Sequence, residues 1–351
     1  MTLFKTIFKT IFKMKLFQWR YSLLLLPIAL WLPMGNAQAL TCKVDSFVSP
    51  NLGTITLANA DNASVEQLLT YSCTNTSDTT EWASVCIGAD GGNNNPSQIN
   101  PRYLPLFGSG SSELNFNMTL NDRSGATWGP RNGKGTEEFI DFVSVTPGLT
   151  TTKSTIIKVS LVPDNHAATA GDYTTNFTSV NTALTFITVG SNTDNQQCSS
   201  PEIQGTSPLS FTVQATVDPQ CTINTTSDVN LGHYSASQTD ITGSNNNAIG
   251  VTCTNDASYN IGLTPSNDNT NGAGVMKGSG SNTDKVPYQL FSDISRTTKW
   301  GNNGSTYDTL TNGFIGKGSG TSEAQTVYVT VPNADFKPDN YSDTVTIRVN
   351  Y

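Results

Sequence analysis

The sequence predicts an all-β protein that consists of two β-sandwich domains in tandem. Three observations lead to this prediction. Charged residues make up only 13% of the 351-residue chain, whereas Asn, Thr, Ser and Gly are abundant. Short segments alternate apolar and polar residues and end at Gly, Asn, Ser or Pro, as half-buried strands joined by turns do. The two halves also repeat the same landmarks in the same order, and the length suffices for two separate cores.

The first 39 residues have the features of a removable export signal. Five basic residues precede Tyr21–Leu32, an apolar run of 12 residues that is too short to span a bilayer. Ala37-Gln38-Ala39 then matches the small-residue pattern of a cleavage site. We therefore expect residues 1–39 to be a signal peptide and the mature protein to be exported.

An internal repeat divides the rest of the chain. Cys42 is followed nine residues later by Asn51-Leu52-Gly53, and Cys221 is followed nine residues later by Asn230-Leu231-Gly232. Further landmarks, including a Trp-Gly pair in each half, recur in the same order. The predicted limits are an N-terminal domain over residues 40–209, a linker strand over 210–220 and a C-terminal domain over 221–351.

Alternating segments in both halves are the expected strands of these domains. Each is short and bounded by turn-forming residues. The clearest are Leu114–Leu120, Thr155–Val162, Thr182–Val189, Thr326–Val331 and Thr344–Tyr351.

The linker strand has the most regular alternation in the chain. Phe211, Val213, Ala215 and Val217 alternate with polar residues, and Pro219 ends the pattern because proline cannot donate to a strand ladder. We expect this strand to complete the sheet of the N-terminal domain. The alternative is an ordinary edge strand in a linker.

Six cysteines lie after the expected signal peptide, and an even number in an exported protein indicates oxidation and pairing. The spacing favours the bridges Cys42–Cys73 and Cys221–Cys253, which leaves Cys86–Cys198. A zinc site is the rival interpretation, but the chain has no CxxC pair and only two histidines. We expect no metal and no other cofactor.

The composition also argues against catalysis and against nucleic-acid binding. His166 and His233 both lie in polar, turn-like stretches, with no pattern of a nucleophile and its base. The formal net charge is −8, although the leader contributes five positive charges, so the surface should be acidic. The prediction is that this protein is not an enzyme and does not bind nucleic acid.

Residues 221–351 resemble the spore coat U-like domain in several motifs. These are Cys221-Thr222-Ile223, Val251–Thr254, Pro287–Asp293, Arg296–Gly301 and Asn340–Val345. Residues 42–198 resemble it more weakly. The resemblance implies a subunit of archaic chaperone–usher pili of the Csu type, in which immunoglobulin-like sandwiches lack their last strand. A periplasmic chaperone fills the gap first, and the N-terminal strand of an adjacent pilin later replaces it.

Two-domain members of this family are similar to the pilus tip subunits, which implies an outer-membrane usher as a further partner and a place at the cell surface. Cleavage after Ala39 would leave only Leu40 and Thr41 before Cys42, too few to reach another subunit. We therefore expect this chain to accept a strand but not to donate one. The closing alternation predicts the edge of an open groove in the C-terminal domain, formed by Val345, Ile347, Val349 and Tyr351.

Apolar loops in the N-terminal domain are the candidate adhesive site. They are expected to converge at its distal tip and to attach the pilus to abiotic or host surfaces, as in biofilm formation. The residues concerned are Pro105, Leu106, Phe107, Pro147, Leu149, Pro201 and Ile203. Three alternatives stay open: these residues fold back on the core, the protein is a glycan-specific tip lectin, or it is a secreted spore-coat-like structural protein.

Overall fold

The computed structural model describes residues 39–108, 110–120, 125–130, 139–191, 203–304 and 310–351. The expected signal peptide, apart from Ala39, and the residues Cys198 and Pro201 lie outside the described residues. Within the described residues no helix is long and apolar enough to cross a membrane.

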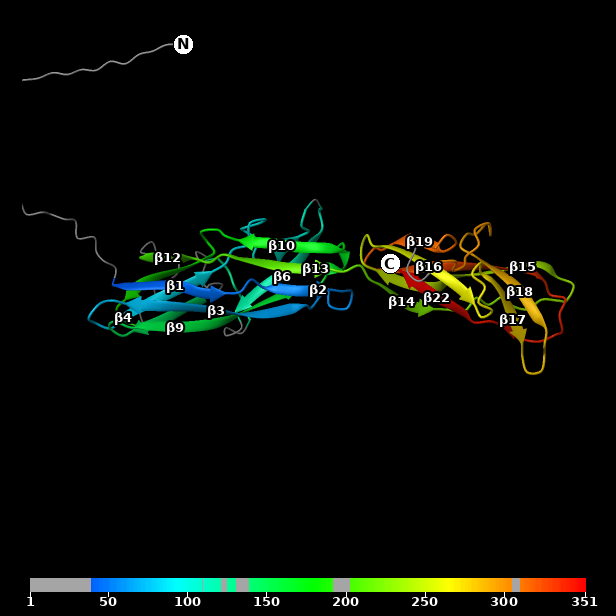
Figure 1. Ribbon diagram of the computed structural model, residues 1–351, viewed down its shortest axis with the longest axis horizontal. Helices are drawn as coiled ribbons and strands as arrows, with labels where there is room; N and C mark the ends of the chain where they lie inside the picture. Colours follow the sequence, from blue (N-terminus) through cyan, green and yellow to red (C-terminus); the bar gives the residue numbers. More distant parts are fainter. Residues whose placement is uncertain (1–38, 109, 121–124, 131–138, 192–202, 305–309) are drawn as a thin grey trace, which may run out of the picture. The chain divides into compact units, whose positions relative to one another are not determined.

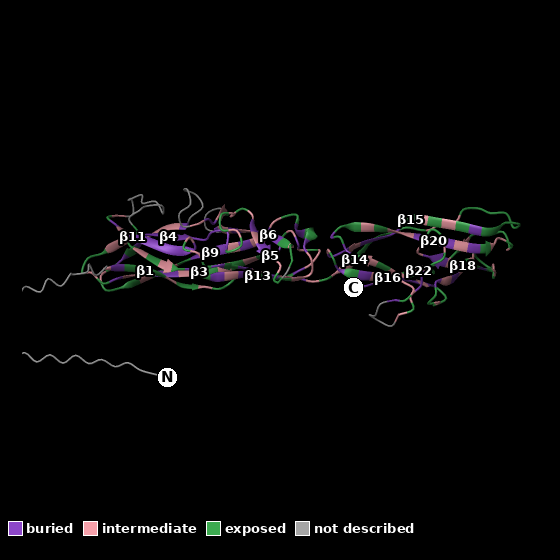
Figure 2. Cartoon of the chain, turned by 90° about the horizontal axis from the view of Figure 1, so that it is seen from above, coloured by how far each residue is buried: buried purple, intermediate pink, exposed green. Residues whose placement is uncertain are grey.

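Strands form two β-sandwiches, which confirms the predicted all-β fold (Figure 1). The N-terminal sandwich comprises β1 to β13 and the C-terminal sandwich comprises β14 to β22. Each has a separate hydrophobic core, seen as alternating buried and exposed positions along the strands (Figure 2). The domain limits given above stay a prediction.

The N-terminal sandwich contains three sheets, with the strand orders β1-β3-β9-β6-β5, β10-β13-β2 and β12-β11-β4-β8, and with β7 paired to β6. A single 3₁₀ turn, Asn165–Ala167, precedes β10. The strands are β1 (Leu40–Phe47), β2 (Asn51–Ile55), β3 (Ser64–Asn75), β4 (Glu81–Gly88), β5 (Arg102–Pro105), β6 (Glu113–Leu120), β7 (Ala126–Thr127), β8 (Phe139–Val145), β9 (Thr150–Leu161), β10 (Gly171–Phe177), β11 (Ala183–Val189), β12 (Gly205–Pro208) and β13 (Phe211–Val217).

The C-terminal sandwich contains two sheets, with the strand orders β14-β15-β20-β18-β17-β21 and β19-β16-β22. Its strands are β14 (Cys221–Thr226), β15 (Thr239–Cys253), β16 (Ser258–Pro265), β17 (Ala273–Gly278), β18 (Lys285–Phe291), β19 (Phe314–Lys317), β20 (Ser322–Asn333), β21 (Tyr341–Ser342) and β22 (Val345–Asn350).

The repeated landmarks occupy matching positions in the two sandwiches. The indole N–H of Trp128 donates to the carbonyl of Ile87 on β4 (3.0 Å), and that of Trp300 donates to the carbonyl of Ile261 on β16 (2.7 Å). Both rings are fully buried, so each N–H needs such a partner.

The matched tyrosines behave in the same way. The hydroxyl of Tyr173 donates to the carbonyl of Thr169, and that of Tyr341 donates to the carbonyl of Lys337, each at 2.7 Å. These pairs align the two halves residue by residue around each tyrosine.

A disulfide bond links the first strand of each sandwich to the neighbouring strand in its sheet. The structure has the bridges Cys42–Cys73, between β1 and β3, and Cys221–Cys253, between β14 and β15. Cys86 is also disulfide-bonded, but the expected partner Cys198 lies outside the described residues.

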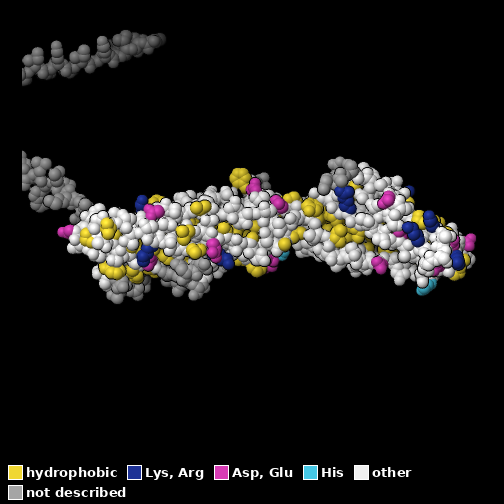
Figure 3. Space-filling model, turned by 60° about the horizontal axis from the view of Figure 1, so that its bottom comes forward, with side chains coloured by type: hydrophobic (Ala, Val, Ile, Leu, Met, Phe, Trp, Pro, Cys, Tyr) yellow, Lys and Arg dark blue, Asp and Glu magenta, His cyan; other side chains and the backbone are white. Residues whose placement is uncertain are grey.

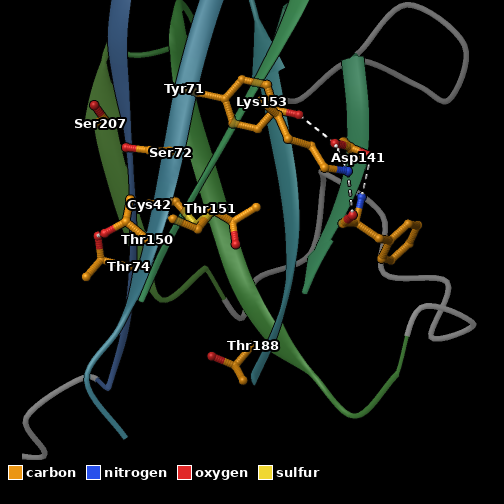
Figure 4. Close-up of a disulfide and its surroundings, with 12 residues drawn as sticks. Cys42, Tyr71, Ser72, Thr74, Asp141, Thr150, Thr151, Lys153, Thr188 and Ser207 are labelled. Carbon is orange, nitrogen blue, oxygen red and sulfur yellow. Dashed lines mark hydrogen bonds and ion pairs between the residues drawn. A yellow bond between two sulfur atoms is a disulfide. The ribbon is translucent and has the colours of Figure 1, made fainter. Parts of the chain in front are cut away.

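Polar contacts near the first bridge join two sheets of the N-terminal sandwich (Figure 4). Asp141 on β8 accepts a hydrogen bond from the Tyr71 hydroxyl on β3 (2.6 Å) and pairs with the Lys153 ammonium on β9 (3.0 Å).

Candidate functional site: an open groove in the C-terminal sandwich

Strand β13 fills a slot between two other strands of the N-terminal sandwich. It pairs antiparallel with β10, from Phe177 opposite Phe211 to Gly171 opposite Val217, and parallel with β2. Its four apolar side chains, those of Phe211, Val213, Ala215 and Val217, are all buried in the core. The preceding strand β12 continues the same course along β11. The segment from Gly205 to Val217 therefore lies along β10 and β11 as an integral part of this sandwich.

Aromatic packing fixes the start of β13. The ring of Phe211 stacks on Phe177, with 4.4 Å between centroids and 7° between planes. It meets Phe47 edge-on at 4.9 Å and lies parallel to Trp128 at 6.1 Å. Such pairs stabilise beyond their buried area, so this end of the strand is firmly held.

The corresponding slot in the C-terminal sandwich is bordered by matching residues. Thr226 and Phe47 both lie five residues after the first cysteine of their half, and Val345 and Phe177 both lie four residues after the matched tyrosine. Strand β22 pairs with β16 as β11 pairs with β4. Its other edge has no partner strand among the described residues.

An open groove of about 760 Å³ occupies this slot. One wall is the segment 226–231 together with Ile223, and the other is the segment 341–345 together with Ile347. Figure 3 shows hydrophobic side chains exposed at the surface of this sandwich. The floor consists of apolar core side chains, those of Ala248, Ile249, Leu263, Met276, Leu290, Val327 and Val329.

Both walls also contribute polar residues, and one of these, Asp343, pairs with Tyr288. The hydroxyl of Tyr288 donates to Oδ2 of Asp343 (2.6 Å), and both residues line the groove. The backbone N–H of Thr344 donates to Oδ1 of Asp343 (2.9 Å). Burial, and then the hydrogen bond and charge of Asp343, raise the pKa of Tyr288 well above its ordinary value. Tyr288 therefore stays protonated and remains a donor.

The predicted edge residues take different positions. Val345 and Ile347 are half-buried and line the groove. Val349 packs against the core further along β22, and Tyr351 follows the strand with 61% of its surface exposed. The wall 226–231 and the pair Tyr288–Asp343 were not predicted from the sequence. Asp343 lies two residues before Val345 and four before Ile347, so all three share one face of the alternating segment. This spacing could have placed the Asp343 carboxylate on the groove wall.

Two of the predicted adhesive loops lie at the same end of the N-terminal sandwich, which we call the far end and define by Leu40, Thr150 and Val189. The carbonyl of Leu149 accepts from the backbone N–H of Asn75, which pairs with Leu40. Ile203 precedes Gln204, whose side-chain oxygen accepts from the N–H of Thr188. Leu149 and Ile203 are 57% and 36% exposed, and Pro147 is half-buried.

The third loop lies at the opposite end, so the predicted convergence of all three loops is wrong. Leu106 forms a bridge with Tyr173, and the N–H of Phe107 donates to Asp172, beside the end of β13 at Val217. Leu106 packs on the core, Pro105 is half-buried and Phe107 is 75% exposed. Strand β9 separates the two ends, and its 12 residues span roughly 35 Å.

The error arose from the direction of one strand. Strand β6 is antiparallel to β9, so it runs toward the far end, whereas strict alternation along the chain predicted the reverse. Strand β8 also runs toward the far end, because the chain turns back between them through the two-residue strand β7, which is antiparallel to β6. The sequence pattern did not reveal β7, so the expected alternation missed one reversal of direction.

Metal ligands are not gathered anywhere in the described part of the chain: no group of three or more His, Cys, Asp or Glu side chains could hold an ion there. The groove has an apolar floor and lies beside an edge of β22 that has no partner strand among the described residues. Such a surface suits an extended peptide strand.

Comparison with known proteins supports the resemblance of the C-terminal half. Residues 208–348 match the model of the Spore Coat Protein U domain. The match also includes strand β13, which lies before the first cysteine of this half. No curated protein sequence matches the chain.

Several solved structures are similar to the chain at low sequence identity and with TM-scores below 0.5. A chain of the CsuC–CsuE chaperone–tip adhesion subunit complex from archaic chaperone-usher Csu pili of Acinetobacter baumannii has 16% identity and a TM-score of 0.44, over 89% of this chain and 100% of that one. The CupB6 tip adhesin from Pseudomonas aeruginosa has 11% identity and a TM-score of 0.34, and the match covers 88% of this chain and 92% of that one. CfaE, the adhesive subunit of CFA/I fimbria of enterotoxigenic Escherichia coli, has 9% identity and a TM-score of 0.31, and the match covers 87% of this chain and 93% of that one. Similarities of this degree assign no ligand.

Proposed function

We propose that this protein is a tip subunit of an archaic chaperone–usher pilus. The groove of the C-terminal sandwich accepts a strand from an adjacent pilin and anchors the subunit. The N-terminal sandwich attaches the pilus to a surface. The N-terminal limits 40–209, the linker strand 210–220 and the C-terminal limits 221–351 are part of this proposal, as are the signal peptide and export to the cell surface.

The observation that carries the proposal is the contrast between the two slots. In the N-terminal sandwich, β13 of the same chain fills the slot and buries four apolar side chains. In the C-terminal sandwich, the corresponding slot is an apolar groove beside the unpaired edge of β22. Each apolar side chain that enters such a groove contributes about 1.5–3 kcal/mol. A free groove of this kind is prone to aggregation, which is why a periplasmic chaperone and then a pilin strand are the expected occupants.

The start of the N-terminal sandwich fits a subunit that does not donate the residues before its first cysteine. Leu40 is 1% exposed and pairs with Asn75, and Thr41 pairs with Thr74. These residues are bound within their own sheet. A subunit with one open slot and one filled slot accepts a single neighbour, as a tip subunit does.

Peptide binding to the full-length protein tests the groove. We expect a labelled peptide with the sequence of Pro208–Asp218 to bind, because β13 fills the corresponding slot. The variant Ile347→Asp places a charge on the wall and should abolish binding, as measured by fluorescence anisotropy. Thr346→Asp is the matched control, since Thr346 is an exposed neighbour on the same strand. Equal binding by all three proteins would contradict the proposed site.

We place the adhesive surface at the far end of the N-terminal sandwich, around Leu149 and Ile203. Both side chains are exposed there, and apolar contacts require no particular sugar or protein. Each can contribute about 1.5–3 kcal/mol on burial, and many pili acting together would multiply weak contacts.

The double variant Leu149→Ser and Ile203→Ser should strongly reduce bacterial attachment to hydrophobic plastic while piliation stays normal. Phe107→Ser is the matched control, because Phe107 is more exposed but lies at the opposite end. Loss of attachment in Phe107→Ser alone would place the adhesive surface elsewhere. Inhibition of the wild type by a defined glycan would favour the lectin function instead.

A further inference from the structure

We propose that the strand that fills the groove carries a side chain with a hydrogen-bond donor, such as threonine, at the position that faces Asp343. This inference rests on the proposed function, in which the groove takes a strand of another subunit. It gives the groove a chemical preference against apolar strands like β13.

Asp343 belongs to the wall that the incoming strand would contact. It lies two and four residues before Val345 and Ile347, so it shares the face of the strand whose side chains line the groove. Its carboxylate offers about four acceptor sites, and the structure uses two, for the Tyr288 hydroxyl and the Thr344 N–H. Acceptor capacity is therefore left on a carboxylate that lines the groove.

The internal repeat identifies the facing position on the incoming strand. Two residues after the matched tyrosines lie Thr175 in the N-terminal half and Asp343 in the C-terminal half. Thr175 is directly opposite Val213 of β13. The strand in the groove should therefore place the equivalent of Val213 opposite Asp343.

The two slots differ in chemistry at this position. Thr175 is neutral and buried, and its hydroxyl oxygen accepts from the side-chain amide of Asn94 (3.0 Å), so a valine can lie opposite it. In the groove, a covering strand would remove water from the Asp343 carboxylate. A valine there supplies no replacement, whereas threonine has the same shape and donates a charge-assisted hydrogen bond.

Two peptides measure the preference on the full-length protein. One has the sequence of Pro208–Asp218, and the other carries Val213→Thr. We expect the wild-type protein to bind the threonine peptide about tenfold more tightly. Asp343→Thr, which copies the N-terminal slot, should reduce the preference to less than about twofold, and Asp343→Asn, a neutral isostere, should give an intermediate preference.

Asp228→Asn is the control for general charge effects. Asp228 lines the opposite wall, so this variant removes one negative charge from the groove while Asp343 remains. It should keep the full preference. A loss of preference in Asp228→Asn equal to that in Asp343→Thr would overturn the inference.

The outcomes separate this inference from the proposed function. If neither peptide binds the wild type, the groove does not accept strands and both fail. If both peptides bind equally, the groove function stands and the inference is overturned. A preference that persists unchanged in Asp343→Thr and Asp343→Asn would also overturn it.

Discussion

Replacing Val213 with Asp is expected to unfold the N-terminal sandwich and to leave the C-terminal sandwich folded. The Val213 side chain is 0% exposed and lies in the core cluster that spans the whole N-terminal sandwich. Burying an unpaired carboxylate there costs several kcal/mol, against a total stability of about 5–15 kcal/mol for a domain. Limited proteolysis followed by mass spectrometry should yield a resistant fragment that begins near Cys221.

Gln214→Asp is the control for that experiment. It introduces the same charge one residue along the same strand, where the side chain is exposed. This variant should resist proteolysis as the wild type does. A well-folded fragment of the wild type that ends before Ser210 would show instead that β13 is dispensable for the first sandwich.

Appending a donor strand should give the largest stabilisation of the C-terminal sandwich. A short turn after Tyr351, followed by a copy of Pro208–Asp218 with threonine at the position of Val213, would place a strand antiparallel to β22 on its free edge. Its buried side chains should raise the melting temperature of this sandwich by at least about 10 °C. Differential scanning calorimetry would measure the change.

A second fusion controls for the added length. It carries serine in place of all four apolar residues of the appended strand and should melt at the wild-type temperature. The apolar fusion should also be monomeric without any chaperone, because the groove is covered in the same chain. Identical melting of the two fusions would mean that the groove does not accept a strand in this direction.

Much of the fold follows from local pattern. The alternation Phe211–Val217 identified a strand that is buried on one face, because a period of two assigns side chains to faces directly. The repeat around Cys42 and Cys221 marked two homologous units, since each cysteine lies at the same place in its own sheet.

Which loops lie at which end of the N-terminal sandwich could not be predicted in the same way. Apolar–polar alternation within a strand does not encode the direction in which the strand runs. The two-residue strand β7, which the sequence did not reveal, reversed the expected place of Phe107. The groove wall at Asp343 alternates in burial with Val345 and Ile347, but alternation alone does not show that such a face lines a groove. The role of the carboxylate emerges only from its contact with Tyr288 on β18.

The position of β13 also determines how the molecule carries mechanical load. Three residues separate Val217 from Cys221, so tension transmitted through the C-terminal sandwich pulls directly on the end of β13. A pull directed along this strand would load the backbone bonds to β10 and β2 in shear together rather than open them one by one. On the other side, the Cys221–Cys253 bridge passes the force from β14 into β15, the longest strand of the described chain. Tension along the chain would thus strain a disulfide bond and a fully inserted strand before any exposed loop.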